Sequence, residues 1–164
     1  IYRQFTDRLF AITNPQTGKV YGYAFSTWAL IDTTSRQPMD LAELPNGGFS
    51  SALIEKEIPI AGPGRIRLKN TENAVRTRQA YYTDLDINGH VNSIRYIEMM
   101  LDLFPAKQFE ASPVKRLEVA YSAEAYANDF LQFYQEPSAK SDATLVEIRK
   151  EEGRIPVVKA AVTF

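Results

Sequence analysis

One helix-length apolar pattern, standing alone among segments typical of strands, constrains the fold of this chain more than any other feature. Its members recur at intervals of three and four residues, at Val91, Ile94, Ile97, Leu101 and Phe104. Pro105 follows directly and marks the end of the pattern. Such a helix is about 20 Å long, which is enough to cross a sheet. One apolar-faced helix with several antiparallel strands wrapped around it predicts an α+β fold.

Strand patterns lie on both sides of this helix. Aromatic and β-branched residues are enriched in strands predicted at residues 8–12, 20–31, 73–82, 114–121, 129–135, 144–150 and 155–164. Turn residues at 14–18 and 151–154 join the first pair and the last pair as hairpins. No helix precedes the first hairpin, and an isolated two-stranded ribbon is at best marginally stable. We therefore expect that part of its packing partner is absent from this sequence.

Residues 38–64 are rich in the two residue types that interrupt regular structure. They contain four of the nine prolines and four of the eight glycines. This composition is typical of a connector, and a long connector is unusual inside one compact domain. The sequence therefore predicts a first unit at residues 1–37, a linker at residues 38–70 and a second unit at residues 71–164.

The charge balance and the rare residue types exclude several function classes. The chain has 19 Lys and Arg against 20 Asp and Glu, so bulk charge does not favour nucleic acid as a partner. No apolar run approaches the roughly 18 residues that would span a bilayer, so no membrane partner is predicted. With no cysteine and only one histidine, thiolate metal sites, cysteine nucleophiles and multi-histidine clusters are excluded. The lack of cysteine fits a cytoplasmic location.

A polar turn directly before the helix contains the residues best suited to chemistry. Asp86, Asn88 and His90 are spaced two residues apart, and they precede a helix N-terminus, where free N–H groups stabilise developing negative charge. This arrangement suits a hydrolytic site with His90 as its base. The competing interpretation is purely structural, because Asp and Asn are common in turns and Asn92 could simply cap the helix. Spacing alone leaves both interpretations open.

Three segments resemble one enzyme family. Residues 84–93, with Tyr96 after them, resemble the D-x-N-x-H-V-N motif of plant and bacterial acyl-acyl carrier protein thioesterases. Residues 118–125 resemble the family's segment that ends in Glu-Cys, with Glu124 on the acidic position and Ala125 in place of the cysteine. Residues 18–32 resemble the end of the family's first repeat.

The resemblance implies a tandem hotdog fold, in which two sheets each wrap around a helix. Residues 71–164 would be the complete second hotdog, which holds the catalytic residues. Residues 1–37 would be the tail of a first hotdog whose opening strand and helix are not in this sequence. Dimerisation through hotdog sheets is a further implication of the family.

The implied activity is hydrolysis of fatty acyl thioesters carried on the phosphopantetheine arm of acyl carrier protein. In this scheme His90 activates water, Glu124 orients the water or the imidazole, and Asn88 polarises the thioester carbonyl. Asp86 either holds the turn or attacks directly to form an acyl-enzyme anhydride. The scheme needs no metal and no organic cofactor. The alternatives are a hotdog thioesterase acting on coenzyme A esters and a hotdog module that only binds acyl groups.

A cluster of basic residues precedes the catalytic turn. Between residues 65 and 78 there is one acid, Glu72, against five cations: Arg65, Arg67, Lys69, Arg76 and Arg78. Acyl carrier proteins are strongly acidic, so these cations are candidates for a docking surface, with Lys115 and Arg116 as additions. A solvated linker and strand face is the competing interpretation.

Overall fold

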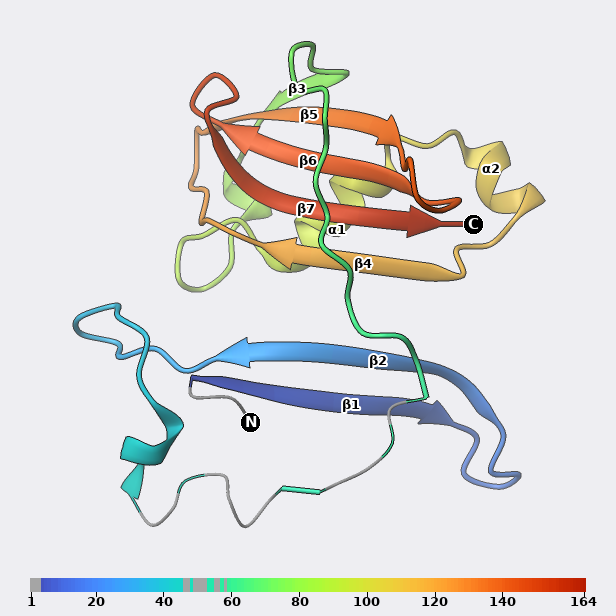
Figure 1. Cartoon of the computed structure of the whole chain (residues 1–164). Coiled ribbons are helices and arrows are strands. Elements are labelled where there is room, and N and C mark those ends of the chain that lie inside the picture. The colour runs from blue at the N-terminus through green and yellow to red at the C-terminus, as the bar shows by residue number, and fades with distance from the viewer. Residues whose placement is uncertain (1–3, 46–47, 49–52, 55–56, 58) are drawn as a thin grey trace. The chain divides into compact units, whose positions relative to one another are not determined.

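A computed structural model describes the chain except for residues 1–3, 46–47, 49–52, 55–56 and 58 (Figure 1). The chain forms two compact units, residues 1–62 and residues 63–164, and each has its own sheet. The boundary falls inside the predicted linker of residues 38–70. Among the described residues, no helix has the length and apolar character that crossing a membrane requires.

The first unit is built on a two-stranded antiparallel ribbon of β1 (Phe5–Thr13) and β2 (Val20–Ala29). The turn between them is held by the Asn14 side chain, which accepts hydrogen bonds from the backbone N–H groups of Gln16 and Thr17. A short 3-10 helix, η1 (Leu41–Glu43), follows in the same unit. The N-terminal hairpin that the sequence predicts is thus confirmed.

The second unit contains a five-stranded antiparallel sheet. Its strands are β3 (Arg76–Gln79), β4 (Arg116–Tyr121), β5 (Phe130–Pro137), β6 (Thr144–Lys150) and β7 (Ile155–Thr163). Their order in the sheet is β3-β5-β6-β7-β4. Consecutive hairpins join β5, β6 and β7, while β4 and β3 pair with the two outer members of this group. This arrangement confirms the predicted C-terminal hairpin and the predicted antiparallel sheet.

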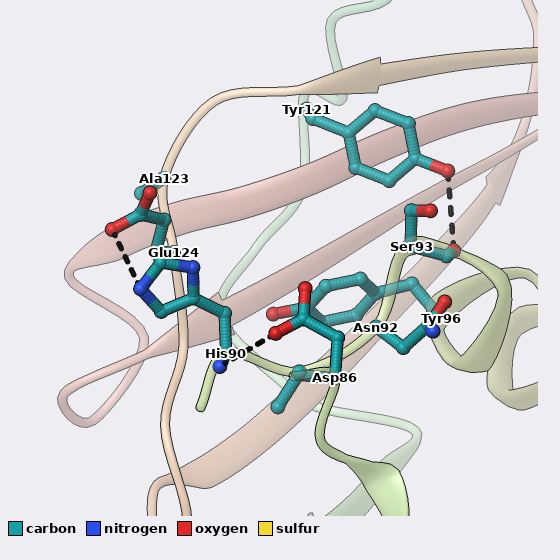
Figure 2. Close-up of a pocket in the computed structure, with 9 residues that line it drawn as sticks. Asp86, His90, Asn92, Ser93, Tyr96, Tyr121, Ala123 and Glu124 are labelled. Atoms are coloured by element: carbon teal, nitrogen blue, oxygen red, sulfur yellow. Dashed lines mark hydrogen bonds and ion pairs between the residues drawn. The ribbon is translucent and has the colours of Figure 1, made fainter. Parts of the chain in front are cut away.

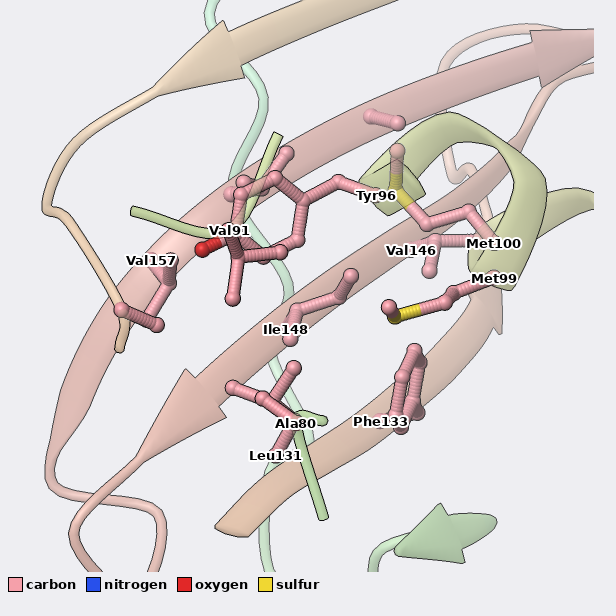
Figure 3. Packing of buried hydrophobic residues seen from close by; sticks show 13 residues of the cluster. Ala80, Val91, Tyr96, Met99, Met100, Leu131, Phe133, Val146, Ile148 and Val157 are labelled. Carbon is pink, nitrogen blue, oxygen red and sulfur yellow. The ribbon is translucent and has the colours of Figure 1, made fainter. Parts of the chain in front are cut away.

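The helix α1 (Ser93–Leu101) packs on one face of this sheet (Figure 3). Its buried residues are Tyr96, Met99 and Met100, which join sheet residues such as Phe133 and Ile148 in one apolar core. Because these core side chains are almost fully excluded from water, they supply most of the driving force for this packing.

The predicted apolar face of the helix is partly wrong, because Ile94 is 57% exposed. The helix begins only at Ser93. Asn92 is its N-cap, and the Asn92 side chain accepts a hydrogen bond from the Ile94 N–H. Val91 is buried before this start, where its N–H donates to the Ala125 carbonyl oxygen at 2.8 Å. The side chains of α1 that face the sheet are accordingly those of Tyr96, Met99 and Met100.

A second short helix, α2 (Ala106–Ala111), was not predicted. Pro105 ends the α1 pattern and also occupies the N-cap of α2, a place that proline tolerates because the first N–H groups of a helix lack partners anyway. Phe104, Phe109 and Phe164 hold α2 in place, with ring centroids 5.1–6.4 Å apart. Sequence periodicity missed α2 because its anchoring contacts come from the far end of the chain.

Residues 63–70, which we call the strap, run across the opposite face of the sheet (Figure 1). The Gly64 N–H donates to Glu118 on β4, and the N–H groups of Lys69 and Asn70 donate to the two carboxylate oxygens of Glu136 on β5. These two donors lower the pKa of the Glu136 carboxyl below its usual value. Leu68 of the strap is buried. Apolar contact and the hydrogen bonds to Glu118 and Glu136, which we call the carboxylate clamps, therefore hold the strap together.

Candidate active site

A cavity of about 230 Å³ opens where the turn before α1 meets the segment that follows β4 (Figure 2). Both segments belong to the second unit. The cavity is lined by Asp86, His90, Val91, Asn92, Ser93, Tyr96, Tyr121, Ala123 and Glu124. The cavity therefore brings together Asp86, His90 and Glu124, which are three of the four catalytic candidates that the sequence suggests. Ser93 and Tyr96 at the start of α1 line it as well.

Asp86 builds the turn that presents His90. Its Oδ1 accepts hydrogen bonds from the backbone N–H groups of Asn88 at 2.8 Å and His90 at 3.2 Å. The Asp86 N–H in turn donates to the His90 carbonyl oxygen at 2.8 Å. Gly89 has a φ of +79°, a left-handed conformation that other residues rarely adopt. The two-residue spacing of Asp86, Asn88 and His90 in the sequence thus reflects a turn in which the Asp86 carboxylate accepts the backbone N–H groups of the other two residues.

His90 and Glu124 face one another across the cavity mouth (Figure 2). The Nε2 atom of His90 lies 3.5 Å from the Oε2 atom of Glu124. Backbone pairing brings these segments together, since Val91 donates to Ala125 and His90 forms an isolated bridge with Tyr126. The two side chains are 25% and 42% exposed, so solvent and a substrate can both reach the pair.

The start of α1 forms the inner wall of the cavity. The Tyr121 hydroxyl donates to the Ser93 carbonyl oxygen at 3.1 Å, and the rings of Tyr96 and Tyr121 lie 6.4 Å apart. Burial raises the pKa of both phenols, so both are neutral at physiological pH. The wall is therefore aromatic and uncharged beside the polar pair at the mouth.

The turn is supported from behind by a buried carboxylate. The Asn92 N–H donates to the backbone oxygen of Asp84, whose side chain is almost fully buried. That side chain accepts hydrogen bonds from the Arg78 guanidinium at 2.8 Å and from the Tyr81 N–H at 2.9 Å. Arg78 is therefore engaged within the unit. The two additional docking candidates are engaged as well, because Arg116 pairs with Glu118 at 2.6 Å and the Lys115 ammonium donates to the Phe164 carbonyl oxygen at 3.1 Å.

Asn88 lies on the exposed side of the turn and is not one of the cavity-lining residues. The sequence did not single out Tyr121 or Ser93, which line the cavity, because a tyrosine on a strand and a serine at a helix start are ordinary in those places. Within the described part of the chain, no group of three His, Cys, Asp or Glu side chains could hold a metal ion.

Comparison with known proteins points to one family. The family model described as "Acyl-ACP thioesterase C-terminal domain" matches residues 68–164. A chloroplastic dodecanoyl-[acyl-carrier-protein] hydrolase of Cinnamomum camphora is 25% identical over 92% of this chain and 41% of its own length. A chloroplastic palmitoyl-acyl carrier protein thioesterase of Gossypium hirsutum is 23% identical over 76% of this chain and 31% of its own length. The chain thus spans less than half the length of these curated relatives.

Solved structures agree with these matches. An acyl-ACP thioesterase from Bacteroides thetaiotaomicron is 40% identical with a TM-score of 0.88, over 100% of this chain and 64% of that one. A 12:0-ACP thioesterase from Umbellularia californica is 19% identical with a TM-score of 0.81, over 99% of this chain and 63% of that one. The second unit accordingly has the α+β hotdog fold, and the fold class expected from the sequence is confirmed.

Proposed function

Because the chain belongs to the acyl-ACP thioesterase family, we propose that it hydrolyses fatty acyl thioesters of acyl carrier protein and releases the free fatty acid. The pairing of His90 with Glu124 at a cavity beside a helix N-terminus is the observation on which this proposal rests most heavily. An imidazole next to a carboxylate is a suitable general base for a hydrolysis.

In the proposed reaction, water attacks the acyl carbonyl carbon while His90 takes its proton. Because Nε2 faces the Glu124 carboxylate, the imidazole tautomer with its proton on Nε2 is favoured, and Nδ1 is left to accept the proton from water. The C–S bond then breaks, and the imidazolium returns a proton to the pantetheine sulfur. Glu124 stabilises the imidazolium between these two steps.

Negative charge develops on the acyl oxygen during the attack. The start of α1 lines the cavity, so its positive dipole end lies close to that oxygen. Asn88 is proposed to donate a hydrogen bond from its side-chain N–H to the acyl oxygen, from the exposed rim of the turn where a carrier-bound thioester arrives. Its position outside the cavity wall of the free protein is compatible with this role, because catalytic hydrogen bonds often form only in the complex.

Asp86 is proposed to hold the turn instead of attacking the substrate. Its Oδ1 already accepts two backbone N–H groups, which orients the carboxylate and keeps His90 in place. Its Oδ2 has no partner among the described residues, so direct attack through an anhydride is the rival route.

Hydrolysis of one acyl group on two carriers tests the proposed function. We expect the purified chain to release dodecanoic acid from dodecanoyl-ACP, with a kcat/KM above that for dodecanoyl-CoA. Equal or reversed preference would assign the coenzyme A alternative. Binding of dodecanoyl-ACP without release of acid would assign the non-catalytic acyl-binding alternative.

The strap supplies the proposed surface for docking of acyl carrier protein. Arg65, Arg67 and Lys69 are exposed and alternate with Ile66, which is half-buried, and Leu68, which is buried. The carboxylate clamps of the strap hold this row of cations in an extended line. Arg76 is exposed on β3, whereas Arg78 is paired with Asp84, so we propose the three strap cations as the principal contacts with the acidic carrier.

Reversing the charge of Arg65 and Arg67 together should raise the KM for dodecanoyl-ACP about tenfold, since two attractive contacts become repulsive. The KM for dodecanoyl-CoA should change less than twofold. The matched control is Lys107→Glu with Lys140→Glu, which makes the same charge change at exposed positions outside the strap. Equal effects on both substrates, or an equal effect of the control, would remove the strap from the docking surface.

The location and the assembly of the protein are part of the proposal. A cytoplasmic location is inferred from the lack of cysteine in the sequence. The plant relatives are chloroplastic proteins. A homodimer is inferred from the resemblance to the family alone.

A further inference from the structure

Tyr126 contacts both members of the proposed catalytic pair, although it does not line the cavity. Its hydroxyl donates a hydrogen bond to Oε2 of Glu124 at 3.0 Å. Its ring stands edge-on to the His90 imidazole, with centroids 5.2 Å apart and an angle of 83° between the planes. One side chain therefore touches the acid through its polar end and the base through its ring.

The residue is itself held by a charged pair. The Tyr126 N–H donates to Oδ2 of Asp129 at 3.0 Å, and the Lys150 Nζ lies 3.6 Å from the same oxygen. The Lys150 Nζ also lies 5.4 Å from the centroid of the Tyr126 ring, within the range of a cation–π contact. The backbone bridge to His90 adds a further anchor. These contacts tie the tyrosine to the end of β6 and to the turn before β5.

Glu124 lies outside the sheet. Its side chain is 42% exposed and sits on a segment after β4 that belongs to no strand, so contacts with neighbouring side chains decide where its carboxylate points. The single oxygen Oε2 accepts from the Tyr126 hydroxyl and also faces His90 Nε2 at 3.5 Å. Fixing this oxygen fixes the distance between acid and base.

We infer that Tyr126 is a positioning residue, which holds the Glu124 carboxylate against His90 during the hydrolysis. This inference rests on the proposed function for its kinetic consequences, but the geometry of the pair exists in the free protein as well. Tyr126 acts through Glu124 and does not touch the substrate.

Tyr126→Phe removes the hydroxyl and keeps the ring. We expect kcat for dodecanoyl-ACP to fall about tenfold, as for a modest misplacement of a catalytic group, with KM within about twofold of the wild-type value. In a Glu124→Gln background the same substitution should change kcat less than twofold, because the group it positions is already lost. Tyr82→Phe, at a tyrosine that is 87% exposed, is the matched control.

Two kinetic outcomes would overturn the inference. One is a Tyr126→Phe enzyme with wild-type kcat. The other is an equal fold-loss in the wild-type and Glu124→Gln backgrounds, which would show that Tyr126 acts independently of Glu124. A wild-type chain that hydrolyses no acyl thioester would contradict the proposed function instead, and the next measurement then decides the inference.

His90 is the only histidine, so its ring nitrogens give one set of signals in ¹⁵N NMR. These signals report the share of the tautomer with its proton on Nε2. We expect Tyr126→Phe and Glu124→Gln each to lower that share in the neutral imidazole, and Tyr82→Phe to leave it unchanged. Identical tautomer shares in the wild-type chain and in Tyr126→Phe would overturn the inference whatever the activity of the chain.

Discussion

His90→Ala should lower kcat for dodecanoyl-ACP by about 10²–10⁴-fold, the usual contribution of a positioned general base. His90 is the only histidine, so no second imidazole can replace it. KM should change little, because docking and burial of the acyl chain do not depend on the imidazole. Initial rates of dodecanoic acid release over a range of substrate concentrations measure both constants.

The same variant should remain folded. The turn uses the backbone N–H and carbonyl of His90, both of which alanine keeps. A thermal unfolding midpoint close to that of the wild-type chain therefore serves as the control. A folded His90→Ala chain that retains more than a tenth of the wild-type kcat would exclude His90 as the base.

Glu124→Gln should lower kcat about 10²–10³-fold, because the neutral amide no longer stabilises the imidazolium or favours the productive tautomer. The substitution is nearly isosteric, and its amide oxygen still accepts from the Tyr126 hydroxyl. Combining it with His90→Ala should cost no more than His90→Ala alone, since residues that act as one unit are not additive. Rates of the two single variants and the double variant on dodecanoyl-ACP provide this comparison.

Glu110→Gln makes the same chemical change at an exposed position on α2 and is the matched control. It should leave kcat within twofold of the wild-type value. Losses that multiply in the double variant would show that Glu124 acts apart from His90. A wild-type rate in Glu124→Gln would remove Glu124 from the mechanism.

Local patterns were sufficient for the fold class. The alternation of strand residues, the turn at 151–154 and the apolar pattern ended by Pro105 each reflect interactions within one segment, and the structure contains the corresponding elements. Which face of the helix is buried was harder to predict, because Ile94 and Tyr96 each belong to a stripe of apolar residues at helical spacing. The stripe of Tyr96, Met99 and Met100 is the buried one, and the backbone hydrogen bond from Val91 to Ala125 that joins the start of the helix to a distant segment has no signal in the periodicity.

The residues of the candidate site also differ in how far the sequence predicts them. The carboxylate turn of Asp86 and His90 is visible as a spacing of alternate polar residues, since both ends of its hydrogen bonds are local. Glu124 could be suggested only by resemblance to a family, because its place beside His90 depends on strand pairing between distant segments. Tyr126 had no sequence signal, since an aromatic residue near a strand is ordinary and its role appears only in the contacts it makes.

The attack of water at this cavity is the central claim, and hydrolysis of dodecanoyl-ACP in H₂¹⁸O tests it most directly. Under single-turnover conditions we expect one ¹⁸O atom in the released dodecanoic acid, no ¹⁸O and no acyl adduct on the peptide that contains Asp86, and loss of the reaction in His90→Ala. Unlabelled dodecanoic acid, or label or an acyl group on Asp86, would contradict the claim, as would the absence of any acid release by the folded chain.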